Sequence, residues 1–170
     1  DDGEFTLRLE NASGGDFISP LSPGVVVLHS ERAPLFTIGE ADRGQGLEAI
    51  AEDGSPMQLA QSLSSVMDAP EADMPEDAPA TNSNVHVFNT PVGADGPGPA
   101  LPGNAYEITF TAERGQNVSF ATMMVQSNDW FFSPNEDGIA LYDADGNPHS
   151  GDVTSQVFLF DAGTEIDEEP

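Results

Sequence analysis

Apolar and polar residues alternate strictly over residues 5–10, where Phe5, Leu7 and Leu9 are separated by polar side chains. Alternation of this kind predicts a β-strand with one buried face, because successive side chains point to opposite faces. Residues 24–30 contain an uninterrupted apolar run, most of it β-branched. That composition predicts a short buried strand.

The strand pattern returns several times later in the chain. Residues 106–111 and 118–125 are the clearest strands, and residues 113–116 between them predict a hairpin turn. Further strands are expected at residues 85–88, 138–142 and 153–160. Seven or eight short strands with this spacing predict an all-β fold, an antiparallel β-sandwich.

The pattern changes to a helical one between residues 39 and 67. Residues 46–52 predict a short helix closed by Gly54, and a second helix is expected to have Ser55 as its N-cap and Pro56 at its first position. The face of this second helix that packs on the sandwich is predicted to carry Met57, Ala60, Leu63 or Ser64, and Met67.

Residues 68–80 hold five acids and three prolines, and predict an extended surface loop.

A chain of 170 residues fits a single domain, here residues 1–170 with a core at about 5–165. Its formal net charge is −26, from 30 acidic residues against four arginines and no lysine. This charge argues against nucleic acid and anionic membranes as partners. It fits either an adhesive or calcium-buffering surface or a salty medium, and the absence of lysine favours the salty medium.

The chain has no cysteine, so it has neither a disulfide framework nor a thiolate metal site. No run of roughly 18 apolar residues predicts a membrane span. The chain begins Asp1-Asp2-Gly3, as expected for a mature secreted protein. These features predict a secreted, extracellular location.

The strongest candidate for chemistry is Asp129, which directly precedes Trp130 and two phenylalanines and follows the strand expected at residues 117–126. A second acidic stretch, with Asp161 and Glu165, follows the last predicted strand. If these two strands are neighbours, the three carboxylates meet at one end of the fold. Oxygen ligands without nearby Cys or His favour Ca²⁺ over zinc.

These stretches also resemble a known family. Residues 123–125 and 129–131, followed by residues 161–165, are similar to the spondin domain of F-spondin and mindin, and residues 34–39 and 46–54 resemble its version in prokaryotic secreted proteins. The resemblance covers residues 5–165. It implies an extracellular C2-like β-sandwich with one calcium ion at its edge, bound by Asp129, Asp161 and Glu165. The animal proteins carry aspartate at the position of Glu165. They also use disulfides, and the absence of disulfides in this chain points to a prokaryotic source.

Other kinds of site have less support. Residues 143–147 resemble the start of an EF-hand loop, but Gly146 is at the fourth position and Thr154 at the twelfth, so an acidic turn is expected. His29 ends an apolar run and is expected to be a hydrogen-bonded structural residue. There is no Gly-x-Ser-x-Gly motif, and only Trp130 offers an aromatic platform for a sugar. The chain is therefore not expected to be an enzyme.

The predicted function is a calcium-stabilised recognition or structural module of the cell surface or extracellular matrix, which adheres to a protein or a glycan. The alternative is a self-assembling subunit of an extracellular filament or layer. In that case the strand at residues 5–10 adds to the sheet edge of another copy.

Overall fold

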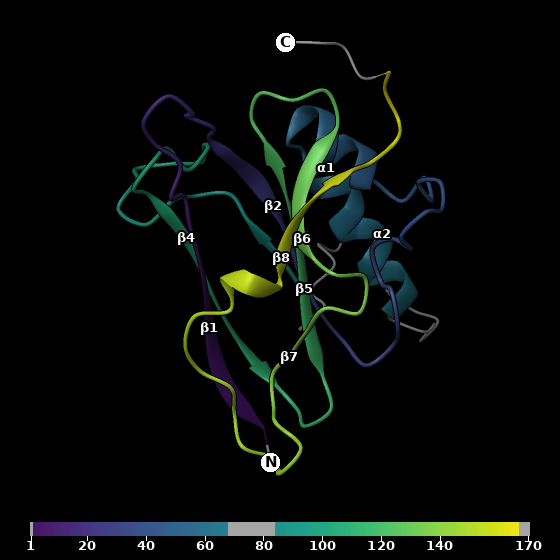
Figure 1. Cartoon of the computed structure of the whole chain (residues 1–170). Helices are drawn as coiled ribbons and strands as arrows, with labels where there is room; N and C mark the ends of the chain where they lie inside the picture. Colours follow the sequence, from purple (N-terminus) through teal and green to yellow (C-terminus); the bar gives the residue numbers. More distant parts are fainter. Residues whose placement is uncertain (1, 68–83, 167–170) are drawn as a thin grey trace.

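A computed structural model describes residues 2–67 and 84–166 of the chain. The acidic loop expected at residues 68–80 lies outside these ranges. The elements are the strands β1 (Gly3–Glu10), β2 (Leu21–His29), β3 (Val85–Phe88), β4 (Ala105–Ala112), β5 (Asn117–Met124), β6 (Trp130–Pro134), β7 (Ile139–Ala140) and β8 (Val157–Asp161), the helices α1 (Leu47–Asp53) and α2 (Met57–Met67), and one 3₁₀ turn, η1 (Thr154–Gln156) (Figure 1).

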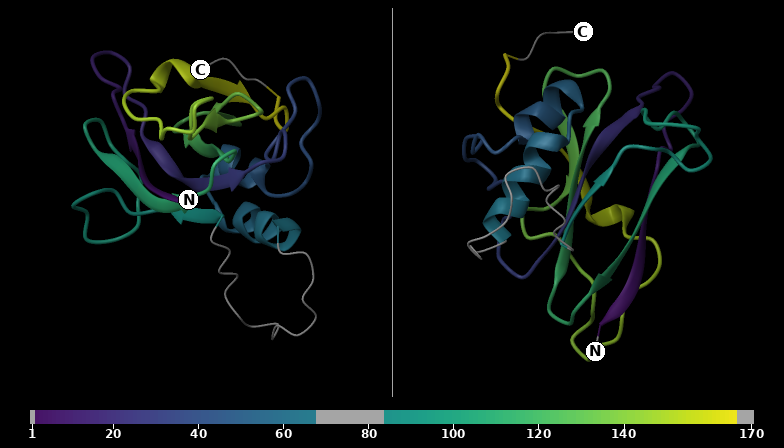
Figure 2. Two further views of the ribbon diagram at one scale, coloured as in Figure 1. Left: turned by 90° about the horizontal axis from the view of Figure 1, so that it is seen from below. Right: turned by 180° about the vertical axis from the view of Figure 1, so that it is seen from behind.

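The strands form two antiparallel sheets, which confirms the predicted all-β sandwich with a short helical insertion. The small sheet pairs β1 with β4 over eight residues, from Gly3 opposite Ala112 to Glu10 opposite Ala105. The large sheet has the order β3-β2-β5-β6-β8, and β7 also pairs with β5. Figure 2 shows the large sheet between the small sheet on one side and the two helices on the other.

The strand β2, which lies between β3 and β5, is covered on both faces. Val26 and Leu28 belong to the apolar cluster shared with the small sheet. Val25 and Val27 belong to the cluster under the helices. All four side chains are fully buried, which explains why this strand is an uninterrupted apolar run instead of an alternating one.

The hairpin predicted around residues 113–116 is wrong. The turn itself exists, since the Gln116 amide donates to the Glu113 carbonyl, but it leads from one sheet to the other. β4 alternates between buried and exposed residues and pairs with β1, whereas seven of the eight residues of β5 are buried. A strand apolar on both faces needs an interior place in a sheet, and β5 takes it between β2 and β6.

The two helices pack on the large sheet as one insertion. Gly46 precedes α1 with φ of 117°, and Gly54 ends it in the left-handed conformation. α2 begins at Met57, one residue later than predicted. The Pro56 carbonyl accepts a hydrogen bond from the amide of Ala60, so Pro56 is the residue directly before the helix. The predicted packing face is wrong at Met57, which is 55% exposed. It is confirmed at Ala60, Leu63 and Ser64, which are buried together with Leu59. The side chain of Met67 lies outside the described part of the structure.

The last strand is also shorter than predicted. Residues 154–156 form the 3₁₀ turn η1, so β8 begins at Val157. No helix in the described part of the chain is long and apolar enough to span a membrane.

Candidate metal site at the end of β6 and β8

The two acidic stretches lie side by side because β6 and β8 are neighbouring antiparallel strands. Trp130 is opposite Asp161 in their register. The amide of Ala162 donates to the carbonyl of Asp129 at 2.9 Å, which continues the pairing beyond the strands. The strand expected at residues 117–126 is β5, which is not a neighbour of β8, because β6, a strand that was not predicted, lies between them. The two acidic stretches still meet, through β6, at the end of the molecule where α1 also lies (Figure 1).

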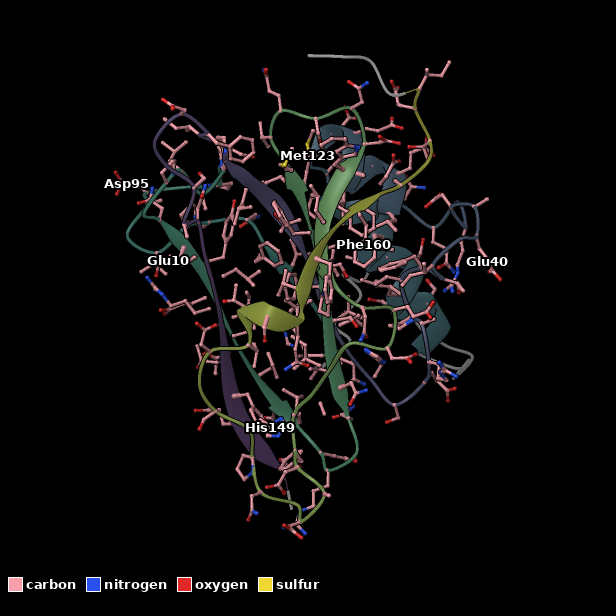
Figure 3. The ribbon with its side chains drawn as sticks, in the orientation of Figure 1. Glu10, Glu40, Asp95, Met123, His149 and Phe160 are labelled. Atoms are coloured by element: carbon pink, nitrogen blue, oxygen red, sulfur yellow. The ribbon has the colours of Figure 1, made fainter. Side chains whose placement is uncertain are left out.

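The aromatic anchor next to Asp129 is Phe131, not Trp130. Phe131 is 1% exposed, whereas Trp130 is 37% exposed. The Phe131 ring packs against Phe36, with centroids 5.5 Å apart, and against Phe160, 5.7 Å apart. Phe160, labelled in Figure 3, belongs to the apolar layer between the large sheet and the helices. This cluster fixes the start of β6 and so holds Asp129 in place.

Asp129 is completely buried, with no exposed surface. Its Oδ2 accepts hydrogen bonds from the backbone amides of Thr164, at 2.9 Å, and Glu165, at 3.0 Å. The turn that supplies these amides is itself closed by Asp161, whose Oδ1 accepts the amide of Gly163 at 2.7 Å. The chain after β8 thus wraps around the Asp129 carboxylate with its backbone donors.

The second oxygen of this carboxylate is not satisfied in the same way. Asp129 Oδ1 is buried and has no hydrogen-bond partner among the described residues. A buried charged oxygen without a partner is costly, by at least about 1–3 kcal/mol for an ordinary polar group and more for a charged one. An oxygen in this state suits a hard cation such as Ca²⁺, which takes carboxylate, carbonyl and water oxygens.

Asp161 and Glu165 are exposed, in contrast to Asp129. Within the described ranges, no group of three or more His, Cys, Asp or Glu side chains is arranged to hold a metal ion. The structure therefore brings the 161–165 turn to Asp129, but through the turn's backbone amides. Ligation by the side chains of Asp161 and Glu165 stays a prediction.

Two residues that the sequence reasoning missed lie beside Asp129. The Thr164 hydroxyl donates to Oε1 of Glu52 at 2.6 Å, and the same hydroxyl lies 3.4 Å from Asp129 Oδ2. Glu52 comes from α1, which packs against β5 and β6. No motif spacing links Glu52 to Thr164, 112 positions apart in the chain. Only the packing of the helical insertion on the sheet could have indicated this pair.

The acidic stretch at residues 143–147 is a tight turn, as expected. Asp143 Oδ1 accepts the backbone amides of Asp145, at 2.9 Å, and Asn147, at 2.8 Å. Hydrogen bonds from the backbone and side chain of Asn147 lower the pKa of Asp143. This carboxylate is already used to close its own turn.

His29 is buried and hydrogen-bonded, as expected for a structural residue. Its Nδ1 lies 2.7 Å from the Glu31 carbonyl and therefore donates to it, which leaves Nε2 to accept from the Ser119 hydroxyl at 2.8 Å. A serine next to a histidine suggests nucleophilic chemistry, but each of these residues is only 2% exposed. The pair lies inside the fold.

A scan against protein-family models finds no match to this chain, and a search of curated proteins finds none either.

Proposed function

We propose that the chain is a secreted, calcium-stabilised module of the spondin type that serves in recognition or as a structural element at a cell surface or in an extracellular matrix. The observation that carries this proposal is the buried Asp129 Oδ1, which no described group satisfies. The resemblance of residues 123–125, 129–131 and 161–165 to spondin domains supports the same assignment.

The calcium ion would be held at the end of β6 and β8. Asp129 Oδ1 is its first ligand in this proposal, and Asp161 and Glu165 are the further carboxylates expected from the sequence. Glu52 joins them as a candidate because its carboxylate is linked to Asp129 through the Thr164 hydroxyl. Ca²⁺ usually takes six to eight oxygens, so backbone carbonyls and water would complete the shell.

The ion's role is structural in this proposal. It would neutralise carboxylates that come from α1, from the β5–β6 loop and from the turn after β8, three segments far apart in the sequence. Such an ion would hold the C-terminal turn against the sandwich and keep one end of the module rigid for contact with a protein or glycan partner.

The alternative function, assembly into a filament or layer through residues 5–10, remains a prediction. In this structure β1 pairs with β4 along its whole length. Addition to another copy would therefore use the remaining edge of β1 or an exchange of this strand between copies. The expectation that the chain is not an enzyme also remains a prediction.

Thermal unfolding with and without a calcium chelator tests the proposal. Binding that occupies the native state at about 100 times its Kd adds about 2.7 kcal/mol, which for a domain of this size raises Tm by roughly 5–10 °C. We expect the chelator to lower the Tm of the wild type by this amount. It should have little further effect on Asp129→Asn, which keeps the shape of the side chain but loses its charge.

Asp95→Asn is the matched control. Asp95 is an exposed residue in the loop between β3 and β4 (Figure 3), and the change removes the same charge. This variant should respond to the chelator as the wild type does. An equal response of Asp129→Asn and the wild type would mean that calcium does not bind at Asp129.

A further inference from the structure

The strand β8 forms one end of the large sheet and is paired on one side only. Its five residues pair with β6, from Trp130 opposite Asp161 to Pro134 opposite Val157. Within residues 2–67 and 84–166, no strand pairs with the other side of β8. The backbone donors and acceptors on that side are therefore open to another strand.

The open side of β8 lacks the usual protection of a sheet edge. Proteins commonly guard such edges with charged residues, proline or a bulge. Asp161, its last residue, is the only charged residue of β8, and the strand has no proline, although the chain as a whole carries 30 acids. Phe158 and Leu159 are large apolar residues that remain 48% and 44% exposed.

The sandwich next to β8 is also incompletely filled. A cavity of about 840 Å³ opens between the small sheet and the large one. Apolar side chains of seven strands line it, among them Leu7 and Leu9 of β1, Phe120 of β5, Phe132 of β6 and Leu159 of β8. The edge strand β8 borders this cavity through Val157, Phe158 and Leu159.

We propose that two copies of this chain pair through β8, antiparallel and edge to edge, to form a symmetric dimer. Open backbone groups along an apolar strand are a template for pairing with another β-strand. The sequence of β8 is self-complementary in this arrangement. Centred on Leu159, it places Phe158 opposite Phe160 of the second copy and Asp161 opposite Val157 of the second copy, so the two aspartates do not face each other.

The twofold axis of this arrangement is perpendicular to the sheet, as between any two equivalent antiparallel strands. The helices of both copies then lie on one face of a continuous sheet, and both small sheets lie on the other. No third copy can join through this contact, because each copy has one open β8 edge and uses it in the pair. This distinguishes the dimer from a filament, and the proposal does not depend on calcium.

Net charge sets the conditions for this dimer. Two copies that each carry −26 repel each other strongly at low ionic strength. In molar salt the screening length falls to about 3 Å, so the short-range apolar contact and backbone pairing can dominate. The dimer should therefore form in high salt and dissociate in low salt.

Sedimentation velocity over a range of protein concentrations tests the proposal, at about 0.1 M and about 2 M NaCl with calcium held constant. We expect the wild type to shift from monomer to dimer with concentration at high salt only. Leu159→Lys should raise the dimer Kd by at least about tenfold. Val92→Lys is the control, because Val92 is 54% exposed in the loop between β3 and β4 and is not part of β8.

Hydrogen exchange of β8 provides a second measurement. Amides on the open side of β8 should exchange more slowly in the wild type at high concentration and high salt, and not in Leu159→Lys. Circular dichroism confirms that each variant is folded. A wild type that stays monomeric in high salt, including one that takes up a foreign peptide at β8, would overturn the proposal. Equal association of Leu159→Lys and the wild type would overturn it too.

Discussion

The carboxylate of Asp129 has two oxygens in very different surroundings. Oδ2 receives two backbone amides from the turn after β8, whereas Oδ1 receives no hydrogen bond from the described residues. The sequence indicated that Asp129 was special, because an acid stands directly before three large aromatic residues. It could not indicate that half of the side chain would be satisfied by backbone donors, since these depend on how the 161–165 turn folds.

Glu52 allows a test of how far the site extends beyond the predicted carboxylates. If Glu52 contributes to calcium binding, Glu52→Gln should weaken the affinity by roughly tenfold, the size of effect seen for supporting residues around metal ligands. Calorimetric titration with Ca²⁺ measures this. Glu48→Gln is a control within the same helix, because Glu48 is exposed and lies in the first turn of α1. Equal affinities of both variants would remove Glu52 from the site.

His29 predicts a pH dependence of stability. Burial lowers its pKa below the ordinary 6.5, more than the Glu31 carbonyl and the nearby charge of Asp137 raise it. The unfolded chain therefore takes up this proton at a higher pH than the native protein does. Stability contributed by neutral His29 is complete above pH 6.5 and is lost as the pH falls towards the lower native pKa.

Urea unfolding between about pH 8 and about pH 5 measures this effect. The wild type should lose more unfolding free energy over this range than His29→Gln, which has no proton to take up. Parallel losses in the two proteins would show that His29 does not cause the acid sensitivity in this range.

At the scale of elements, the sequence predicted most strands because burial determines their pattern. Strict alternation identified β1, which has one partly buried face, and the uninterrupted run identified β2, which is buried on both. The pairing of strands was harder to predict. The turn between β4 and β5 is as short as a hairpin turn, yet it joins two sheets, because β4 finds its partner in β1, almost a hundred residues away in the chain.

The contact between α1 and α2 makes a specific demand at Gly46. Its φ is 117°, and a Cβ there would lie 2.4 Å from the backbone nitrogen of Leu59. We expect Gly46→Ala to lower the unfolding free energy by about 1–3 kcal/mol more than Gly93→Ala. Gly93 is a matched control, because its φ is 79° but a Cβ there would meet nothing within 4 Å. Equal losses in urea unfolding would show that the helices can move apart at no cost.

At the scale of the whole molecule, the charge balance dominates. The described residues include ion pairs of Arg8 with Glu10 and Glu107, and of Arg32 with Asp137. Four arginines can offset only a small part of 30 acids. If the chain is adapted to a salty medium, its Tm should rise between low and molar NaCl at constant calcium, because salt screens the repulsion. A flat Tm would argue for the alternative reading of the acidity as an adhesive or calcium-buffering surface.

In the proposed site, calcium binds where Asp129 Oδ1 lacks a partner among the described residues. Long-wavelength anomalous diffraction from crystals grown with Ca²⁺ tests it most directly, since it locates the ion without assuming its ligands. We predict one anomalous peak within about 2.3–2.6 Å of Asp129 Oδ1, the normal range of Ca–O distances. A crystal with calcium in excess and no peak at this oxygen would contradict the claim.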